Sequence, residues 1–449
     1  MITKLRHGWQ SMRSSFWFVP ALMVVDTVVL AILLITVDTS VDLHLVARWP
    51  LLFGAGAAGA RGLLTTVASS MITVAGVVFS ITLVALSLTS SQYTSRVIRN
   101  FMRDRVNQWV LGVFLGIFAY CLVVLRTIRE ADEGAFVPTL AVLTGLLLAF
   151  VGIAVLIHFI HHIATSIQAS SIVATAAQET LAAVDHLFPE ALGDDNGEGA
   201  DDTLTRALAG QPWSAVPAGK TGYIESLDMD ALLDVARTLE TILRMEHGVG
   251  EFVVSDTPLV SLIDPGELDE ATTARLNAVF VISPQRTVEQ DVAFGIRQVV
   301  DVAMKALSPG INDTTTAVMC VDYLAAILTR LAARRIGTPH AFEEGELRVI
   351  ARGPSFEGLM SEAFDQIRQN AEGNVAILLR LLGALQTIAG QTASPNRRWV
   401  LRQKVDEIAE AAERSIASPH DRDRLTHRLV RVRQALVAEP LSIVRTNQH

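Results

Sequence analysis

Charged and aromatic residues are scarce in this sequence, and cysteine is almost absent. Only 18% of the 449 residues are charged and 6% are aromatic, whereas half are hydrophobic and the mean hydropathy is +0.38. The hydrophobic excess is therefore aliphatic, which is typical of helices that cross a membrane. A chain of this length also predicts two or more structural units.

The few cysteines and the negative charge argue against several classes of protein. Cys121 falls in an apolar run and Cys320 far from it, so we expect no structural disulfide and no metal site. A formal net charge of −9 argues against a nucleic-acid partner. The sequence has no glycine-rich dinucleotide loop, Walker loop, nucleophile elbow or zinc-protease motif. We therefore expect neither an enzyme nor a bound cofactor.

Four apolar runs are long enough to cross a bilayer, which takes about 20 residues. They are Phe16–Val37, Val67–Thr89, Trp109–Leu125 and Val137–Ile163. A weaker stretch rich in glycine and alanine, Leu51–Ala60, predicts an interfacial or re-entrant segment. The lipid bilayer is therefore an expected partner.

Basic residues alternate between the loops that join these runs. Lys4, Arg6 and Arg13 precede the first run, and Arg96, Arg99, Arg103 and Arg105 lie between the second and third, opposed by Asp104 alone. The remaining two loops are nearly neutral or acidic. Because basic loops stay on the cytoplasmic side, both termini are predicted to be cytoplasmic, in a bacterial inner membrane.

The second run contains a stripe of small and hydroxyl residues. Thr66, Thr73, Ser80 and Ser87 are seven residues apart, and Ser69, Gly76 and Ser90 form a second row at the same spacing, interrupted by Leu83. Helical periodicity places both rows on one narrow face. This face is either a seam for close helix packing or the lining of a water path, and both hold if it is the contact of a homo-oligomer.

Two further features of the apolar runs are ionisable. Asp26 lies near the middle of the first run, where a carboxylate is costly. It is either an ion or proton site, or a neutral acid bonded to a neighbouring hydroxyl, for example on the second run. His158, His161 and His162 share one helix face at the end of the fourth run, but without the Cys or carboxylate that would complete a metal site.

The rest of the chain predicts a cytoplasmic α+β domain, mostly helical, behind the α-helical membrane domain. We expect the membrane domain with a helical extension over residues 1–186 and a flexible acidic linker over 187–219. A small α/β unit follows over 220–283, and helices over 284–438. The pairs Ser394-Pro395 and Ser418-Pro419 open two helices that should form a hairpin.

A turn between two of these helices could hold a ligand. We expect Asn312 or Asp313, which follow Ser308 in the turn, to cap the second helix. The alternative is an anion site at the helix N-terminus, where Thr314 and two further threonines add hydroxyls to free N–H groups.

Two stretches, residues 70–125 and 286–313, resemble the bacterial predicted membrane proteins grouped as domain of unknown function 2254. The string ALSPGIND at 306–313 is the most specific part of the resemblance. The family commonly has a proline after the Asn-Asp pair, where this chain has Thr314. The resemblance implies an inner-membrane protein with a cytoplasmic tail, and it implies no established activity.

The sequence therefore favours an oligomeric channel or transport-type protein with a cytoplasmic regulatory domain, which would conduct a small ion or bind another small ligand. The polar stripe and Asp26 favour this interpretation. The alternative is a membrane-anchored regulatory or scaffold protein whose cytoplasmic domain binds a ligand or partner. The acidic linker and the lack of catalytic motifs favour that interpretation.

The alternating basic loops make a topology prediction. A periplasmic reporter fused after residue 130 should be active, and a cytoplasmic reporter fused at the C-terminus should be active, because arginines are retained on the cytoplasmic side. The reverse pattern of reporter activity would contradict the predicted orientation.

Overall fold

The computed structural model describes residues 17–40, 56–92, 104–129, 136–189, 208, 210–263, 268–336, 340–343 and 346–438. The chain divides into two compact units, Met1–Ser171 and Ile172–His449, each of which is described by itself. We call them the membrane unit and the second unit. The division puts the predicted helical extension of the membrane domain, as far as residue 186, mostly into the second unit.

Four long helices build the membrane unit: α2 (Phe18–Ser40), α5 (Ala57–Gln92), α7 (Arg105–Thr127) and α8 (Thr139–Ser166). Each is long and apolar enough to cross a membrane, as is α14 (Thr314–Ala332) in the second unit, which makes five candidates among the described residues. The described end of the expected re-entrant segment Leu51–Ala60 is helical instead, because Ala57–Ala60 form the first turn of α5. Residues 51–55 of that segment lie outside the described residues.

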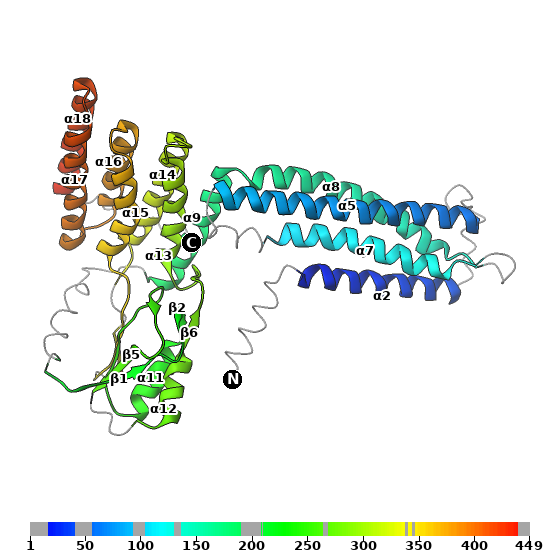
Figure 1. The fold of residues 1–449 in the computed structure, drawn as a ribbon, viewed down its shortest axis with the longest axis horizontal. Coiled ribbons are helices and arrows are strands. Elements are labelled where there is room, and N and C mark those ends of the chain that lie inside the picture. Colours follow the sequence, from blue (N-terminus) through cyan, green and yellow to red (C-terminus); the bar gives the residue numbers. More distant parts are fainter. Residues whose placement is uncertain are drawn as a thin grey trace, which may run out of the picture. The chain divides into compact units, whose positions relative to one another are not determined.

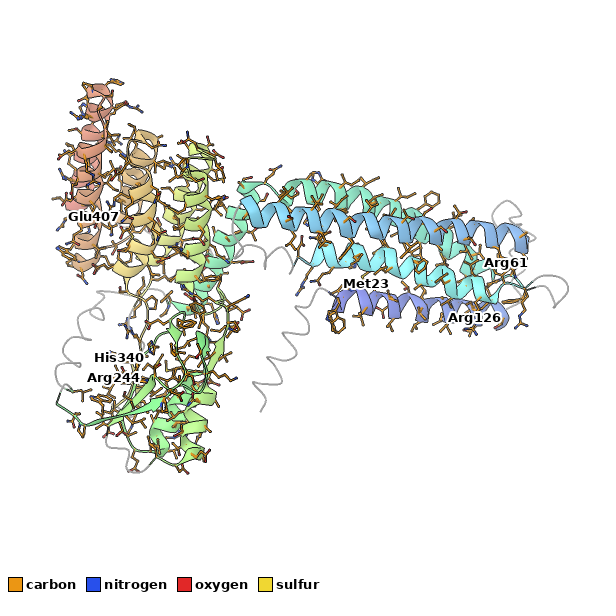
Figure 2. All side chains as sticks on the ribbon, in the orientation of Figure 1. Met23, Arg61, Arg126, Arg244, His340 and Glu407 are labelled. Atoms are coloured by element: carbon orange, nitrogen blue, oxygen red, sulfur yellow. The ribbon has the colours of Figure 1, made fainter. Side chains whose placement is uncertain are left out.

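Helix α7 lies between α2 and α5 (Figure 1). A Cβ atom on Gly112 would lie 2.6 Å from the sulfur of Met23, and one on Gly116 would lie 3.0 Å from Thr27. Met23 lies on the side of α2 that faces α7 (Figure 2). The two glycines therefore let α2 approach α7 more closely than any side chain would allow.

Helix α8 packs on α5 and α7 by the same device. A Cβ atom on Gly152 would lie 3.0 Å from the sulfur of Met71 on α5 and 3.3 Å from Ile117 on α7. Asp38, at the end of α2, accepts hydrogen bonds of 3.2 Å from the backbone N–H groups of Leu140 and Ala141 in the first turn of α8. Asp38 thus satisfies two free N–H groups at the N-terminus of α8.

The interior of the membrane unit is apolar over most of its length. The inward face of α7 carries Val110, Phe114, Ile117, Cys121 and Val124, all at most 1% exposed. The buried polar side chains of α7 lie in its first turn, where Asn107 and Gln108 are 1% and 2% exposed. The described bundle therefore encloses no polar path between Val110 and Val124.

The second unit contains two small β-sheets. Strands β1 (Trp213–Pro217), β5 (Pro258–Ile263), β3 (Leu243–Met245), β8 (Glu346–Ile350) and β7 (Ala341–Glu343) form one sheet in that order. Strands β4 (Phe252–Val253), β2 (Gly222–Leu227) and β6 (Phe280–Ser283) form the other. Helices α11 (Met229–Thr238) and α12 (Glu270–Val279) connect them.

Two boundaries of the predicted α/β unit differ from the structure. The sequence predicts that Trp213–Pro217 belongs to the flexible linker 187–219, but this segment forms β1. It pairs with β5, and Val216 is only 1% exposed. Strands β7 and β8 come from the predicted helical region 284–438 and return to the first sheet, where β8 pairs with β3. Residues 190–207 and 209 of the linker lie outside the described residues.

Six helices of the second unit form three stacked hairpins. They are α13 (Val292–Ala306) with α14, α15 (Phe356–Asn370) with α16 (Val375–Ala389), and α17 (Pro395–Ser415) with α18 (Pro419–Val437). Helices α14, α16 and α18 lie side by side in one layer (Figure 1). The predicted hairpin at the C-terminal end is confirmed, with Ser394 and Ser418 as N-caps. Such stacking resembles that of helical repeat proteins.

Helix α9 (Ala169–Leu187) packs on the first of these hairpins. A Cβ atom on Gly295 of α13 would collide with the hydroxyl of Thr180 on α9. Arg334 donates to the backbone carbonyl of Phe188 at 3.0 Å and pairs with Asp185 at 2.6 Å. These contacts explain why α9 belongs to the second unit, although it follows α8 almost directly along the chain.

Two adjacent arginines at the start of α17 close the ends of two other helices. Arg397, 2% exposed, donates to the backbone carbonyls of Ala332 and Arg334 at 3.1 and 2.9 Å, just past the end of α14. Arg398 donates to the carbonyls of Leu436 and Ala438 at 3.1 and 2.7 Å, at the end of α18. The last carbonyls of a helix lack partners within it, and a cation is favourable there.

We predict that Arg397→Leu lowers the free energy of unfolding by about 2–3 kcal/mol, because it leaves buried carbonyls without donors. Urea unfolding of the full-length protein in detergent, followed by tryptophan fluorescence, measures this change. Arg402→Leu, at an exposed position of the same helix, should change the free energy by at most about 0.5 kcal/mol. Equal effects of the two variants would contradict the capping role of Arg397.

Candidate functional site

Helix α5 carries two stripes with the same alternating spacing of three and four residues. Its inward stripe packs on α7 and α8 and is buried at Leu64, Ala68, Met71, Ala75, Val78, Thr82 and Ala85. Its outward stripe consists of the predicted residues Thr66, Ser69, Thr73, Gly76, Ser80 and Ser87, all of which are exposed. Because two residues turn an α-helix by about 200°, the two stripes lie on opposite faces.

The outward stripe is polar, and its side chains are small. The hydroxyls of Thr66 and Thr73 donate to the backbone carbonyls of Gly62 and Ser69, each at 2.8 Å. A Cβ atom on Gly62 or Gly76 would meet no atom within 4 Å. The stripe is therefore not a packing seam within the described bundle, and its small side chains leave the backbone of α5 open to a neighbouring surface.

Asp26 lies on the outward face of α2. Its neighbours at helical spacing, Leu22, Val29 and Leu30, are each more than one-third exposed, and Asp26 is exposed with them. Among the described residues no hydrogen bond or ion pair is found for its carboxylate. A bond to a hydroxyl of α5 in the same protomer, one of the sequence interpretations, does not occur because α7 separates α2 from α5.

The three histidines of α8 do not gather around one point. His162 contacts the carboxylate of Asp104 at 2.5 Å and the hydroxyl of Ser166 at 3.3 Å, and its ring stacks on His158 at 6.2 Å between centroids. His161 is exposed. No group of three or more His, Cys, Asp or Glu side chains in the described part of the chain could hold a metal ion.

Sequence reasoning missed this link between α7 and α8. Asp104 also accepts from the N–H of Val106 at 2.9 Å and so caps α7. An acid directly before an apolar helix is a signal for such a cap. The fully buried Asn107 lies one turn further along α7, and neither of its side-chain polar atoms has a hydrogen-bond partner among the described residues.

The turn between α13 and α14 is a compact capped turn. Asp313 is the N-cap of α14 and accepts from the N–H and the hydroxyl of Thr316 at 3.0 and 2.6 Å. Asn312 adopts a left-handed conformation with φ of 50°. The hydroxyl of Ser308 donates back to the carbonyl of Lys305 at 2.6 Å, so it closes α13 rather than opening α14.

The first turn of α14 lies beside the first turn of α16. Asn374 caps α16 through the N–H of Ile377 and donates to the hydroxyl oxygen of Thr314 at 3.0 Å. The hydrogen bonds from Thr316 hold the pKa of the Asp313 carboxyl below its ordinary value of 3.8. A carboxylate already occupies the N-terminus of α14, which favours the capping interpretation over the anion site.

We predict that Asp313→Ala lowers the free energy of unfolding by about 0.5–2 kcal/mol at pH 7 through loss of the cap. Because the folded pKa is depressed, the contribution is fully present above pH 3.8 and is lost as the pH falls through the folded pKa. Unfolding of full-length wild type, Asp313→Ala and Asp313→Asn between pH 3 and 7 measures both effects. Asp313→Asn should keep the cap without this pH dependence. An unchanged stability of Asp313→Ala would contradict the cap and favour the anion site.

Comparisons with other proteins bear on the identity of the chain. An uncharacterized protein of Mycobacterium tuberculosis and one of Mycobacterium bovis are each 35% identical over 383 residues, which covers 83% of this chain and 72% of the relative. No solved structure matches the chain. The sequence pattern of one family, described as a predicted membrane protein of domain of unknown function 2254, matches residues 13–387. With apolar helices of membrane-spanning length and this match over most of its length, the chain belongs to the DUF2254 family of predicted membrane proteins.

Proposed function

We propose that the protein is a homo-oligomeric channel or transport-type protein of the bacterial inner membrane. In this proposal α2, α5, α7 and α8 cross the membrane, both termini are cytoplasmic, and the second unit is a cytoplasmic regulatory domain. The alternating arginine loops support this orientation. The proposal includes no catalytic activity.

One observation carries the proposal: the polar stripe of α5 faces outward while the interior of the bundle is apolar. A hydroxyl face gains nothing from lipid, whereas it gains hydrogen bonds and close approach from another helix or from water. The apolar column from Val110 to Val124 leaves no room for a polar path inside the bundle. A path for a small ion would therefore run between protomers rather than through the interior of one bundle.

The surroundings of α14 favour a place outside the membrane for this fifth apolar helix. Its mid-helix Asp322 pairs with Arg380 of α16, and Arg330 pairs with Asp185 of α9 at 2.6 Å. The side chains in both pairs are 39–51% exposed. Half-exposed ion pairs suit a water-facing surface, and lipid would make them costly.

A second candidate function is a membrane-anchored scaffold. The three stacked hairpins of the second unit favour it, because stacked helical repeats commonly present extended binding surfaces. In a scaffold the protein need not form a ring, so the oligomeric state in lipid distinguishes the two candidates.

We predict that cysteines placed along the stripe either react with a water-soluble thiol reagent or are protected from both water-soluble and lipid-soluble reagents. Thr66→Cys, Thr73→Cys and Ser80→Cys would be tested in a protein that lacks Cys121 and Cys320. Reaction along the whole stripe supports a wet path, and protection from both reagents supports a dry seam against another helix. Phe79→Cys, on the exposed apolar flank of α5 that lies away from Ser70, is the matched control and should react only with a lipid-soluble reagent. Stripe cysteines that behave like the control would contradict the proposal.

A further inference from the structure

We propose that the outward face of α2, anchored by Asp26, binds the outward stripe of α5 in a second copy of the chain. This inference rests on the proposed homo-oligomer and names the two surfaces that meet in it. This one contact would give Asp26 on the outward face of α2 hydrogen-bond partners and would cover the hydroxyl stripe of α5.

The two surfaces lie at the same depth of the membrane unit. Thr27, next to Asp26, contacts Gly116 of α7, and the following residue Ile117 contacts Gly152 together with Met71 of α5. Ser69, Ser70 and Thr73 lie within two residues of Met71, which is about 3 Å along the helix axis. Asp26 and these hydroxyls therefore share one layer of the bundle.

A cyclic oligomer preserves this match. When the symmetry axis runs along the membrane normal, every protomer sits at the same depth, so the carboxylate of one copy meets the hydroxyls of the next without any shift. Helices α2 and α5 lie on opposite sides of α7 (Figure 1), as a head-to-tail contact requires. A self-complementary contact of α5 with α5 would leave Asp26 in lipid.

The side chains of the two faces are complementary in chemistry. No hydrogen bond is found for the hydroxyls of Ser69 and Ser70 in the described part of the chain, so both are available as donors to the carboxylate of Asp26. Thr66 and Thr73, in contrast, donate within their own helix. Hydroxyl donors and a carboxyl acceptor are the partners that a buried polar contact between membrane helices uses.

The two faces also complement each other in size. Helix α2 runs parallel to α7, because Met23 lies against Gly112 and Thr27 against Gly116. Helix α5 runs antiparallel to α7, because Arg61 near its start donates to the carbonyl of Ile128 at the end of α7. Arg61 and Arg126 lie at the same end of the membrane unit (Figure 2). The two faces are therefore antiparallel. Counting from the shared layer, Leu22 falls opposite Gly76, where α5 has no side chain, and Leu33 falls opposite Thr66.

Disulfide crosslinking in membranes tests the contact with Asp26 left in place. In a protein lacking Cys121 and Cys320, the pairs Leu22→Cys with Gly76→Cys and Leu33→Cys with Thr66→Cys should form crosslinked multimers. Leu22→Cys with Thr66→Cys is the matched control and should not crosslink, because its two positions differ by ten residues, about 15 Å in depth.

A second measurement tests the role of Asp26 itself. Asp26→Leu should weaken association by about 3- to 20-fold per contact, and Asp26→Asn, which still accepts hydrogen bonds, should weaken it less. Dilution of the fluorescently labelled protein in lipid vesicles measures the association. Unchanged association of Asp26→Leu would overturn the anchoring role.

The remaining outcomes separate this inference from the proposed function. Crosslinking of Thr66→Cys alone, without crosslinking of the matched pairs, would place α5 against α5 and overturn the inference, while the homo-oligomer would stand. A protein that remains monomeric in lipid and forms none of these crosslinks would overturn both.

Discussion

Backbone amide and carbonyl groups that leave water must find hydrogen-bond partners, and the rest of the structure depends on this constraint. In the membrane unit it is met inside each helix, and Asp38 supplies acceptors for the free N–H groups of α8. In the second unit Asp313, Asn374 and Ser394 close helix N-termini. Arg397 and Arg398 close two C-termini, so helices from distant parts of the chain can end in the interior.

The helices could largely be predicted from the sequence because long apolar runs and capping residues are local signals. The Asp313 cap and the hairpin opened by Ser394-Pro395 and Ser418-Pro419 belong to this class. Strands β1 and β8 could not be predicted, because each is short and pairs with a strand far along the chain, β5 and β3 respectively. Strand β7 is a short edge strand that pairs only with β8. The placement of α9 depends on Thr180 meeting Gly295, which no local pattern indicates.

The candidate site shows where periodicity stops being informative. Both stripes of α5 have the same spacing, and small side chains suit an inward seam as well as an outward face. The direction of each is decided by Gly145 and Gly152 of α8, against which Leu64 and Met71 pack. The larger residues of α5 therefore fill the space that these glycines leave, and the hydroxyl residues remain outside. One sequence interpretation joined Asp26 to a hydroxyl of the second run, and the structure places Asp26 and these hydroxyls at a common depth but on opposite sides of α7 (Figure 1).

The two arginines of α17 have a consequence for the order in which the protein is made. The carbonyls of Ala332 and Arg334, at the end of α14, accept hydrogen bonds from Arg397, which lies 65 and 63 residues later in the chain. At a synthesis rate of about 5–20 residues per second, the ribosome takes several seconds to cover that distance. The four apolar helices of the membrane unit are complete long before this point. The membrane unit is thus complete first, and the end of α14 lacks the donors of Arg397 until α17 has been made.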